Sequence, residues 1–297
     1  MIRSIRAGQL DIAYAEHGPA DGEPVVLMHG YPDDIHAWDG VAPRLAAAGL
    51  RVIVPYLRGY GPTRFIDAAT PRSGEQAALG ADLLALMDAL AIPQALLAGY
   101  DWGGRACCVV AALWPARVRG LVTVGGYNVH DVAAEVLPGA PEQELRYGYQ
   151  WYFCTPRGEA GLAANRAALA RLLWRMWSPG YRFDDAMFAA TATSFDNPDH
   201  VAVVIHSYRV RYGWVAGDPA HAPIEARLAL RPRITVPTIV LDGAADGVRP
   251  PAPETAHARH FTDLRDVQVL DGVGHFLPRE APDAVVAALA RLQATLA

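Results

Sequence analysis

The sequence predicts an α/β fold: a mostly parallel sheet with helices on both faces, interrupted by an inserted helical lid. Strand and helix signals alternate through the first half, a long segment with little strand signal follows, and the alternation then resumes. This order predicts a core formed by residues 1–127 and 234–297 and a lid formed by residues 128–233. Ligands of open parallel sheets bind beyond the carboxyl ends of the strands, which an inserted lid would cover.

The core elements follow from the hydrophobic pattern. Short apolar runs predict buried strands, and apolar residues at helical spacing, such as Leu79, Leu83 and Leu86, predict helices. The predicted strands are residues 25–30, 51–57, 95–100, 120–126, 235–243 and 266–272. The predicted core helices are residues 38–48, 75–90, 102–113 and 282–296. Aromatic-rich helical stretches fill the lid, at 144–153, 165–177, 184–195 and 200–214, separated by turn signals.

Composition limits the class of protein. The 297 residues are 52% hydrophobic and 19% charged, which is enough to bury a large core. The net charge is 26 − 31 = −5 without basic runs, so nucleic acid and anionic membranes are poor candidate partners. No apolar run approaches the roughly 20 residues of a membrane helix, and the first residues lack the apolar region of a secretory signal.

The three cysteines, Cys107, Cys108 and Cys154, are too few and odd in number for a disulfide framework. This count favours a reducing, cytoplasmic location. Cys107 and Cys108 lie in an apolar helical stretch, so we expect them to be small core residues. The sequence leaves the oligomeric state open.

The main chemical motif lies between a predicted strand and a predicted helix, at residues 99–104. Its frame is that of a nucleophile elbow, a turn so tight that only small residues fit two positions before and two after the nucleophile. Gly99 and Gly103 meet that demand, and the apex holds Asp101. The competing interpretation is that Asp101 caps the following helix.

A second motif, residues 29–32, directly follows the first predicted core strand. In an elbow-type site this loop and the residue after the nucleophile supply the two N–H groups of an oxyanion hole. The candidates are therefore the backbone N–H groups of Tyr31 and Trp102. The competing interpretation of residues 29–32 is a plain turn made rigid by Pro32.

A base and its acid are predicted near the C-terminus. His275 lies just past the last predicted strand, where a general base would face the elbow. Asp246 and Asp242 both follow or end the preceding strand, and Asp246 is preferred because it lies further out on the loop. The interval 275 − 246 = 29 residues leaves room for one helix and one strand. The order nucleophile, acid, histidine is typical of elbow hydrolases.

Together the motifs HGYP, GYDWGG, GAADG and GVGHF resemble the epoxide hydrolase branch of the α/β-hydrolases, whose close relatives are haloalkane and fluoroacetate dehalogenases. Two residues depart from the family pattern: Tyr100 stands where His is common, and Tyr31 where Phe is usual. The resemblance implies a hydrolase that needs no cofactor. The sequence also contains no metal-ligand spacing and no phosphate-binding loop.

An aspartate nucleophile limits the reaction. A carboxylate that attacks a saturated carbon forms an ester, which water activated by His275 can cleave, whereas a serine would form an inert ether. Epoxides and alkyl halides are therefore the expected substrates. An epoxide oxygen leaves as a basic alkoxide and needs an acid, which tyrosine can supply. The resemblance assigns Tyr149 and Tyr208 to this role, with Tyr152 and Tyr212 as the alternatives.

The expected substrate is a small apolar epoxide, converted to a vicinal diol. Pro32, Trp151 and Phe153 are the candidate substrate contacts. The alternative is a haloalkane or haloacid dehalogenase with the same nucleophile, for which Arg105 could bind a carboxylate. However, Arg105 is more simply expected on the helix surface or in a salt bridge. A non-catalytic binding protein of this fold is disfavoured because Asp101, Asp246 and His275 are all present.

Overall fold

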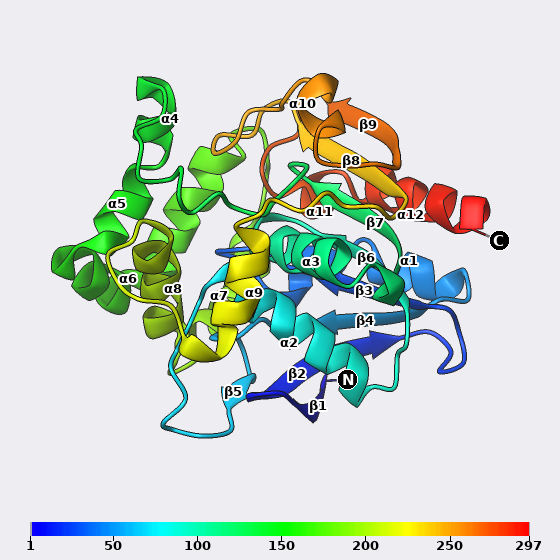
Figure 1. Ribbon diagram of the computed structural model, residues 1–297, viewed down its shortest axis with the longest axis horizontal. Helices are drawn as coiled ribbons and strands as arrows, with labels where there is room; N and C mark the ends of the chain where they lie inside the picture. The colour runs from blue at the N-terminus through cyan, green and yellow to red at the C-terminus, as the bar shows by residue number, and fades with distance from the viewer. Residues whose placement is uncertain (1, 297) are drawn as a thin grey trace.

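The computed structural model describes residues 2–296, which fold around one nine-stranded sheet (Figure 1). The strands are β1 (Ile2–Ala7), β2 (Leu10–His17), β3 (Pro24–Met28), β4 (Arg51–Pro55), β5 (Arg64–Phe65), β6 (Ala95–Gly99), β7 (Val118–Val124), β8 (Thr238–Gly243) and β9 (Leu264–Leu270). Each of the six strands predicted from apolar runs overlaps one of these.

The spatial order is β1-β2-β4-β3-β6-β7-β8-β9, and β5 pairs with β2. Every neighbouring pair from β4 to β9 is parallel, whereas β2 runs antiparallel to β1, β4 and β5. The hairpin β1–β2 has no counterpart among the predicted strands. Most of β1 is solvent-exposed, so its sequence lacks the continuous apolar run that marks the buried strands.

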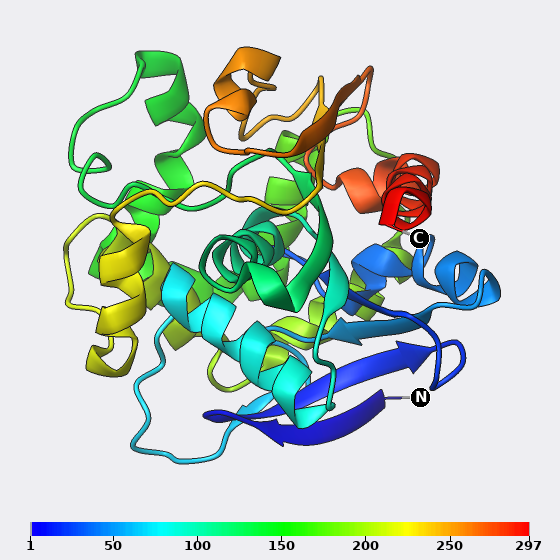
Figure 2. The same ribbon diagram turned by 45° about the vertical axis from the view of Figure 1, so that its right-hand side comes forward.

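Helices cover both faces of the sheet (Figure 2). On one face α12 packs on β6, β7 and β8, and α1 packs on β4; on the other, α3 packs on β3, β6 and β7, and α2 packs on α3 and β1. Outside the segment between β7 and β8, the helices are α1 (Ala42–Ala47), α2 (Gln76–Ala89), α3 (Asp101–Leu113), α10 (Glu254–Ala258), α11 (Leu277–Glu280) and α12 (Pro282–Leu296), with the 3-10 turns η1 (Ile35–Trp38) and η2 (Pro115–Arg117).

The predicted helix 38–48 is wrong in extent, because the chain forms the short turn η1 and then α1 instead. Gly40 lies between the two elements and Pro43 is within the first turn of α1, where its missing N–H is tolerated. Cys107 and Cys108 are fully buried in α3, as predicted, and all three cysteines are free thiols.

Between β7 and β8 the chain, fully described there, forms helices and loops. These elements are α4 (Pro141–Arg146), α5 (Gly148–Cys154), α6 (Pro156–Trp177), α7 (Asp185–Ala192), α8 (His200–Arg211) and α9 (Ala222–Leu228), with the 3-10 turns η3 (Thr193–Asp196) and η4 (Pro219–His221). Helices α4, α5, α6 and α8 gather at one side of the sheet, while α9 lies against α2 (Figure 1). We call this part the helical insertion.

The carboxyl ends of the parallel strands converge beside the helical insertion. The segments that leave β3, β6, β8 and β9 there carry Tyr31, Asp101, Asp246 and His275, respectively. Because β3 pairs with β6 and β8 pairs with β9, residues far apart in the sequence meet at this edge.

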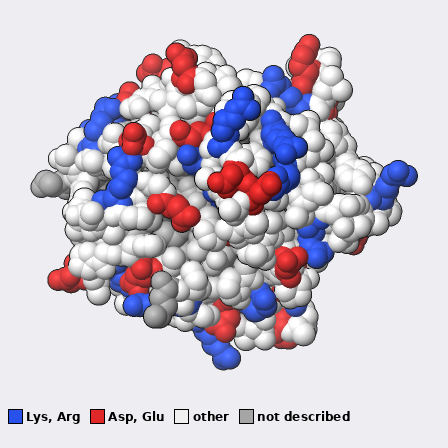
Figure 3. All heavy atoms as spheres, turned by 180° about the vertical axis from the view of Figure 1, so that it is seen from behind, with Lys and Arg blue, Asp and Glu red and all other residues white. Residues whose placement is uncertain are grey.

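The exposed surface mixes both signs of charge. Acidic and basic side chains are interspersed over the face shown in Figure 3. Within residues 2–296 no helix is long and apolar enough to cross a membrane.

Candidate active site

Asp101 occupies the apex of a tight turn between β6 and α3. Its backbone φ is 50°, in the left-handed region that residues other than glycine rarely adopt. The turn is as close as the sequence predicts: a Cβ atom on Gly103 would lie 2.1 Å from the Met28 carbonyl oxygen, and one on Gly99 would lie 2.6 Å from the Gly103 backbone. The strained apex makes Asp101 the first residue of α3, separated from the end of β6 only by Tyr100.

The loop after β3 closes on this carboxylate. The Tyr31 backbone N–H donates to Asp101 Oδ1 at 2.7 Å. The Tyr31 and Trp102 rings stack with centroids 5.7 Å apart, and both side chains are buried. One of the two N–H donors expected for an oxyanion hole, that of Tyr31, therefore already contacts Asp101, and Trp102 directly follows Asp101 in the chain.

His275 reaches the same carboxylate from the loop after β9. Its Nδ1 lies 2.9 Å from Asp246 Oδ2, and its Nε2 lies 3.8 Å from Asp101 Oδ2. Asp246 thus occupies the position predicted for the acid, whereas Asp242 pairs with His257 at 3.0 Å. The Nε2 atom of His275 is buried and has no hydrogen-bond partner among the described residues, which leaves it free to bind a water or a substrate atom.

The charges around His275 favour its protonated form. Burial alone would lower its pKa, but the Asp246 carboxylate, by charge and by hydrogen bond, and the Asp101 carboxylate together raise the pKa to about 9. The pKa of Asp246 is lowered: burial opposes its charge, but His275 and two backbone N–H groups stabilise the carboxylate. Oδ1 of Asp246 accepts hydrogen bonds from the backbone N–H groups of Val248 at 2.7 Å and Arg249 at 2.9 Å.

Tyr149 of α5 and Tyr208 of α8 line the same cavity as Asp101. Their rings pack edge to face with centroids 5.6 Å apart. Burial, the Tyr208 hydroxyl and the Asp101 charge raise the pKa of Tyr149 well above its ordinary value. Burial and the Asp101 charge raise the pKa of Tyr208 likewise, although its hydrogen bond with Tyr149 acts in the opposite direction. Both hydroxyls therefore keep their protons at neutral pH and can act as donors.

Gln150 fixes the direction of the Tyr149 hydroxyl. Its Nε2 donates to the Tyr149 oxygen at 2.9 Å, and its Oε1 accepts from the Tyr212 hydroxyl at 2.6 Å. The Tyr149 oxygen thus accepts from Gln150, and the Tyr149 hydroxyl is also hydrogen-bonded to that of Tyr208. Tyr212, one of the alternative donors, is thus a partner of Gln150, and Tyr152 is absent from the lining around Asp101.

The cavity over Asp101 is small, about 50 Å³. The three candidate substrate contacts lie outside its lining. Phe153 packs behind Tyr208 at 5.5 Å between ring centroids, and Trp151 stacks on Tyr212 at 4.2 Å. The Pro32 carbonyl accepts from Trp174 Nε1 at 2.7 Å.

Arg105 is placed differently from its expected position. It lies one turn after Asp101 on α3 and is only 7% exposed, so it is not a surface residue. It forms no ion pair and no hydrogen bond with any of residues 2–296, so the expected salt bridge is also wrong. Its side chain lines the cavity over Asp101. Helical spacing places residue 105 correctly on the face below residue 101, but burial could not be inferred because the covering helices are remote in sequence.

The last turn of α6 is tied to both loops that carry the acid and the histidine. The Trp177 carbonyl accepts from the backbone N–H of Gly247 at 2.9 Å and of His275 at 3.2 Å. Ser178, the next residue, shares its Oγ between Glu280 and the Phe276 N–H. The helical insertion is therefore hydrogen-bonded directly to the backbone of the site.

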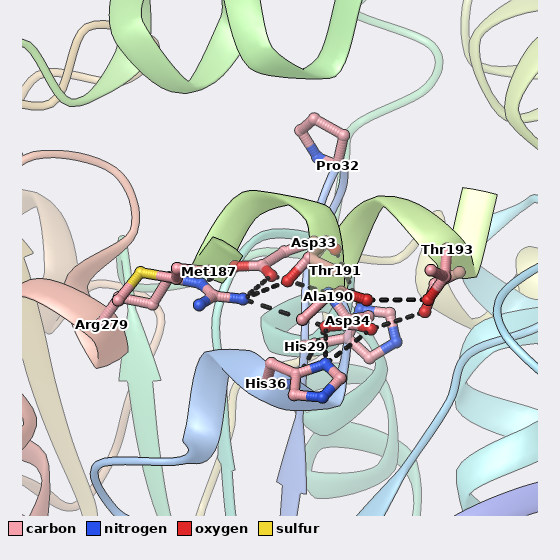
Figure 4. Close-up of polar contacts among 12 residues, drawn as sticks. His29, Pro32, Asp33, Asp34, His36, Met187, Ala190, Thr191, Thr193 and Arg279 are labelled. Carbon is pink, nitrogen blue, oxygen red and sulfur yellow. Dashed lines mark hydrogen bonds and ion pairs between the residues drawn. The ribbon is translucent and has the colours of Figure 1, made fainter. Parts of the chain in front are cut away.

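A buried ion pair joins the loop after β3 to α11 (Figure 4). Arg279 of α11 donates through Nε to Asp33 at 2.8 Å, with a second bond through Nη2, and Nη2 also donates to Thr191 of α7 at 2.8 Å. The Tyr100 hydroxyl donates to Asp33 at 2.6 Å, and the guanidinium packs over the Trp174 ring. Sequence patterns did not identify this cluster.

Metal-binding groups are not gathered at this site. Within residues 2–296 no cluster of three or more His, Cys, Asp or Glu side chains is arranged to hold a metal ion.

Comparison with known proteins agrees with this geometry. Residues 23–282 match the family model described as the alpha/beta hydrolase fold. The chain therefore belongs to the alpha/beta hydrolase family, and it is a hydrolase.

Within that family the similar proteins point to one branch. A crystal structure of a candidate epoxide hydrolase from Klebsiella pneumoniae is 49% identical, with a TM-score of 0.95, over 98% of this chain and 96% of that one. An epoxide hydrolase from Caballeronia sordidicola is 28% identical over 93% of this chain and 88% of its own length. Epoxide hydrolase A from Mycobacterium tuberculosis is 24% identical over 97% of this chain and 95% of its own length. The chain lies in the epoxide hydrolase branch.

The ion pair between Asp33 and Arg279 generates a stability prediction. Asp33→Asn removes the main partner of a buried guanidinium, so we expect the free energy of unfolding to fall by about 3–5 kcal/mol. Urea unfolding followed by circular dichroism measures the change. The matched control is Asp283→Asn, which removes the partner of Arg44 in a pair whose Asp283 side chain is 87% exposed. We expect a change of at most about 1 kcal/mol there, and equal losses in the two variants would contradict the assignment.

Proposed function

We propose that the enzyme opens a small epoxide to a vicinal diol through a covalent ester on Asp101. The observation that carries the proposal is that two tyrosines, the buried Tyr208 and the partly buried Tyr149, share a small cavity with an elbow aspartate. The names of the related epoxide hydrolases support the same reaction. A departing halide is best held by N–H donors, whereas a departing epoxide oxygen needs acidic O–H groups, which Tyr149 and Tyr208 provide.

In the first step the Asp101 carboxylate attacks one epoxide carbon. The C–O bond of the ring breaks, and Tyr149 and Tyr208 donate to the oxygen that leaves. Gln150 supports this step because the hydrogen bond that it donates positions the Tyr149 hydroxyl. The product of this step is an alkyl ester of Asp101, which unlike an ether can be hydrolysed.

In the second step water attacks the carbonyl carbon of the ester. His275 removes a proton from this water through Nε2, while Asp246 holds the ring at Nδ1 and stabilises the imidazolium. The negative charge that develops on the carbonyl oxygen is stabilised by the N–H groups of Tyr31 and Trp102. Tyr31 already donates to Asp101 Oδ1, so this donor is in place before the reaction begins. The bond between the carbonyl carbon and the alkyl oxygen then breaks, and that oxygen takes the proton of the new carboxylic acid, which releases the diol and restores the Asp101 carboxylate. The proton held by His275 returns to the tyrosine that protonated the epoxide oxygen in the first step.

Residues 128–233 act in this proposal as the lid over the reaction. They contribute both tyrosines, and their helices exclude bulk water from the cavity. We also propose that the enzyme works in a reducing cytoplasm, since its three cysteines are all free thiols.

The oxygen transferred to the product tests the nucleophile. In a single turnover with excess enzyme in water enriched in heavy oxygen, we expect an unlabelled diol and a labelled Asp101 peptide. The reason is that the new product oxygen comes from the Asp101 carboxylate and solvent oxygen replaces it. Mass spectrometry of the diol and of the proteolysed enzyme measures both. A labelled diol with an unlabelled peptide would mean that Asp101 acts as a general base.

The lid tyrosines are tested by removing one hydroxyl at a time. We expect Tyr149→Phe and Tyr208→Phe each to slow ester formation by about ten- to a hundredfold, because the two donors partly replace one another, and the double variant to be nearly inactive. Rapid-quench kinetics with an epoxide measures this step. Tyr152→Phe is the matched control and should react at the wild-type rate. Halide release by a double variant that still consumes alkyl halides would favour dehalogenation instead.

The pH dependence of the second step follows from the charges around His275. Below its pKa of about 9 the free enzyme holds His275 protonated, partly through the Asp101 carboxylate. Ester formation removes that negative charge, so the pKa of His275 falls in the intermediate. We expect hydrolysis of the ester to accelerate with rising pH and to level off below about pH 9. Single-turnover decay of the ester measures the profile, and a rate that rises only above pH 9 would contradict this account.

A further inference from the structure

Arg105 is a buried cation that forms no ion pair and no hydrogen bond with any described residue, although the nearby Asp101 carboxylate favours its charge. It is 7% exposed, and its Nε is buried without a hydrogen-bond partner among residues 2–296. Burying a guanidinium without a partner is costly, and structures tolerate such a group where it serves binding or catalysis. The proposed epoxide opening does not use it.

The charged groups around Arg105 are engaged elsewhere. Arg211, whose charge disfavours that of Arg105, is paired with Glu135 at 3.0 Å. Arg249 donates to Asn128 at 2.8 Å. Glu225 is close enough for Arg105 to lower its pKa, although burial, the larger effect, raises it.

The oxygens of Glu225 are already bonded. They accept the Ala77 N–H at 2.9 Å and the Gln76 side chain at 3.0 Å. The remaining neighbouring anion is Asp101, which lines the same cavity but must attack the substrate. A substrate anion would therefore be the first unengaged partner available to Arg105.

Arg105 lies where two cavities meet. It lines the 50 Å³ cavity over Asp101 and also a neighbouring cavity of about 410 Å³. Part of the wall of the larger cavity is apolar, formed by Val132, Ala133, Val210, Ala222, Ala226 and Ala229. The acids Glu75, Asp218 and Glu225 also lie on that wall and would repel an anion placed deep inside it. An anionic group therefore fits at the junction, and an apolar one fits beyond it.

Building on the proposed function, we propose that the substrate is an epoxide carrying a carboxylate on or next to the ring, bound by Arg105, with its apolar remainder in the larger cavity. The planar guanidinium fork matches a carboxylate and can donate two parallel hydrogen bonds to it. Residues 101 and 105 are one helical turn apart, with Cβ atoms roughly 5–6 Å from each other. This spacing sets the short distance between the carboxylate and the carbon that Asp101 attacks.

The first test compares two epoxides that differ only in charge. Phenylglycidate has a carboxylate on one ring carbon and a phenyl group on the other, and phenylglycidamide replaces the carboxylate with a neutral amide. We expect wild-type kcat/KM to be about ten- to a hundredfold higher for the carboxylate. Arg105→Met should abolish this preference and Arg105→Lys should retain part of it. Arg249→Met, which removes a cavity arginine that has partners, should leave the ratio of the two substrates unchanged.

The second test measures binding without turnover. Cinnamate and cinnamamide are unreactive analogues of the two epoxides, and a thermal shift assay reports their binding. We expect cinnamate, but not cinnamamide, to raise the Tm of the wild type and neither to raise that of Arg105→Met. Without ligand, Arg105→Met should be at least as stable as wild type, because a buried charge without an ion-pair partner is removed. A destabilised variant would instead indicate a structural role.

The two tests separate the inference from the function on which it rests. Hydrolysis of both epoxides at equal kcat/KM, unaltered by Arg105→Met, would overturn the carboxylate assignment and leave epoxide hydrolysis standing. Binding of cinnamate through Arg105 without hydrolysis of either epoxide would support the carboxylate site and overturn the proposed epoxide hydrolysis.

Discussion

The buried ion pair between Asp33 and Arg279 joins the parts of the chain on which the site depends. Asp33 lies two residues after Tyr31 and accepts from Tyr100, which precedes Asp101, while Arg279 lies in the helix directly after His275. One carboxylate thereby connects the loops after β3, β6 and β9. Because the guanidinium also donates to Thr191, the same interaction fixes α7 of the helical insertion to the core. The positions of nucleophile, histidine and oxyanion loop are thus mutually dependent.

The parts that sequence predicted well are those whose cause is local. Buried parallel strands are short apolar runs, and the elbow needs glycines at fixed positions around Asp101, so both can be identified from neighbouring residues. The Asp33–Arg279 pair joins residues 246 positions apart, and only the fold brings them together. The burial of Arg105 likewise depends on helices of the insertion. The exposed strand β1 was missed for another reason, because it has little apolar sequence to reveal it.

The site places several charges in a small volume and assigns each a different task. Asp246 is held ionised by His275 and two backbone N–H groups, and the tyrosines are held neutral by burial and by the nearby carboxylate. Arg105 has no ion-pair or hydrogen-bond partner among the described residues, and its burial costs stability in the free enzyme. That cost would be offset when a substrate carboxylate binds, so the interaction favours the loaded state over the empty one.

The hydrogen bonds of the Trp177 carbonyl bear on how the insertion can be exchanged between relatives. This one acceptor holds the backbone of both Gly247 and His275, so α6 must end at a fixed register for the two loops to keep their spacing. A chimaera that receives the helical insertion of a relative would preserve the core chemistry only if a backbone carbonyl occupies the position of the Trp177 carbonyl. Adding or deleting one residue at the end of α6 would rotate that carbonyl by about 100° around the helix axis. The register at the end of α6, more than the outer residues of the helical insertion, therefore determines which exchanges of the insertion give an active enzyme.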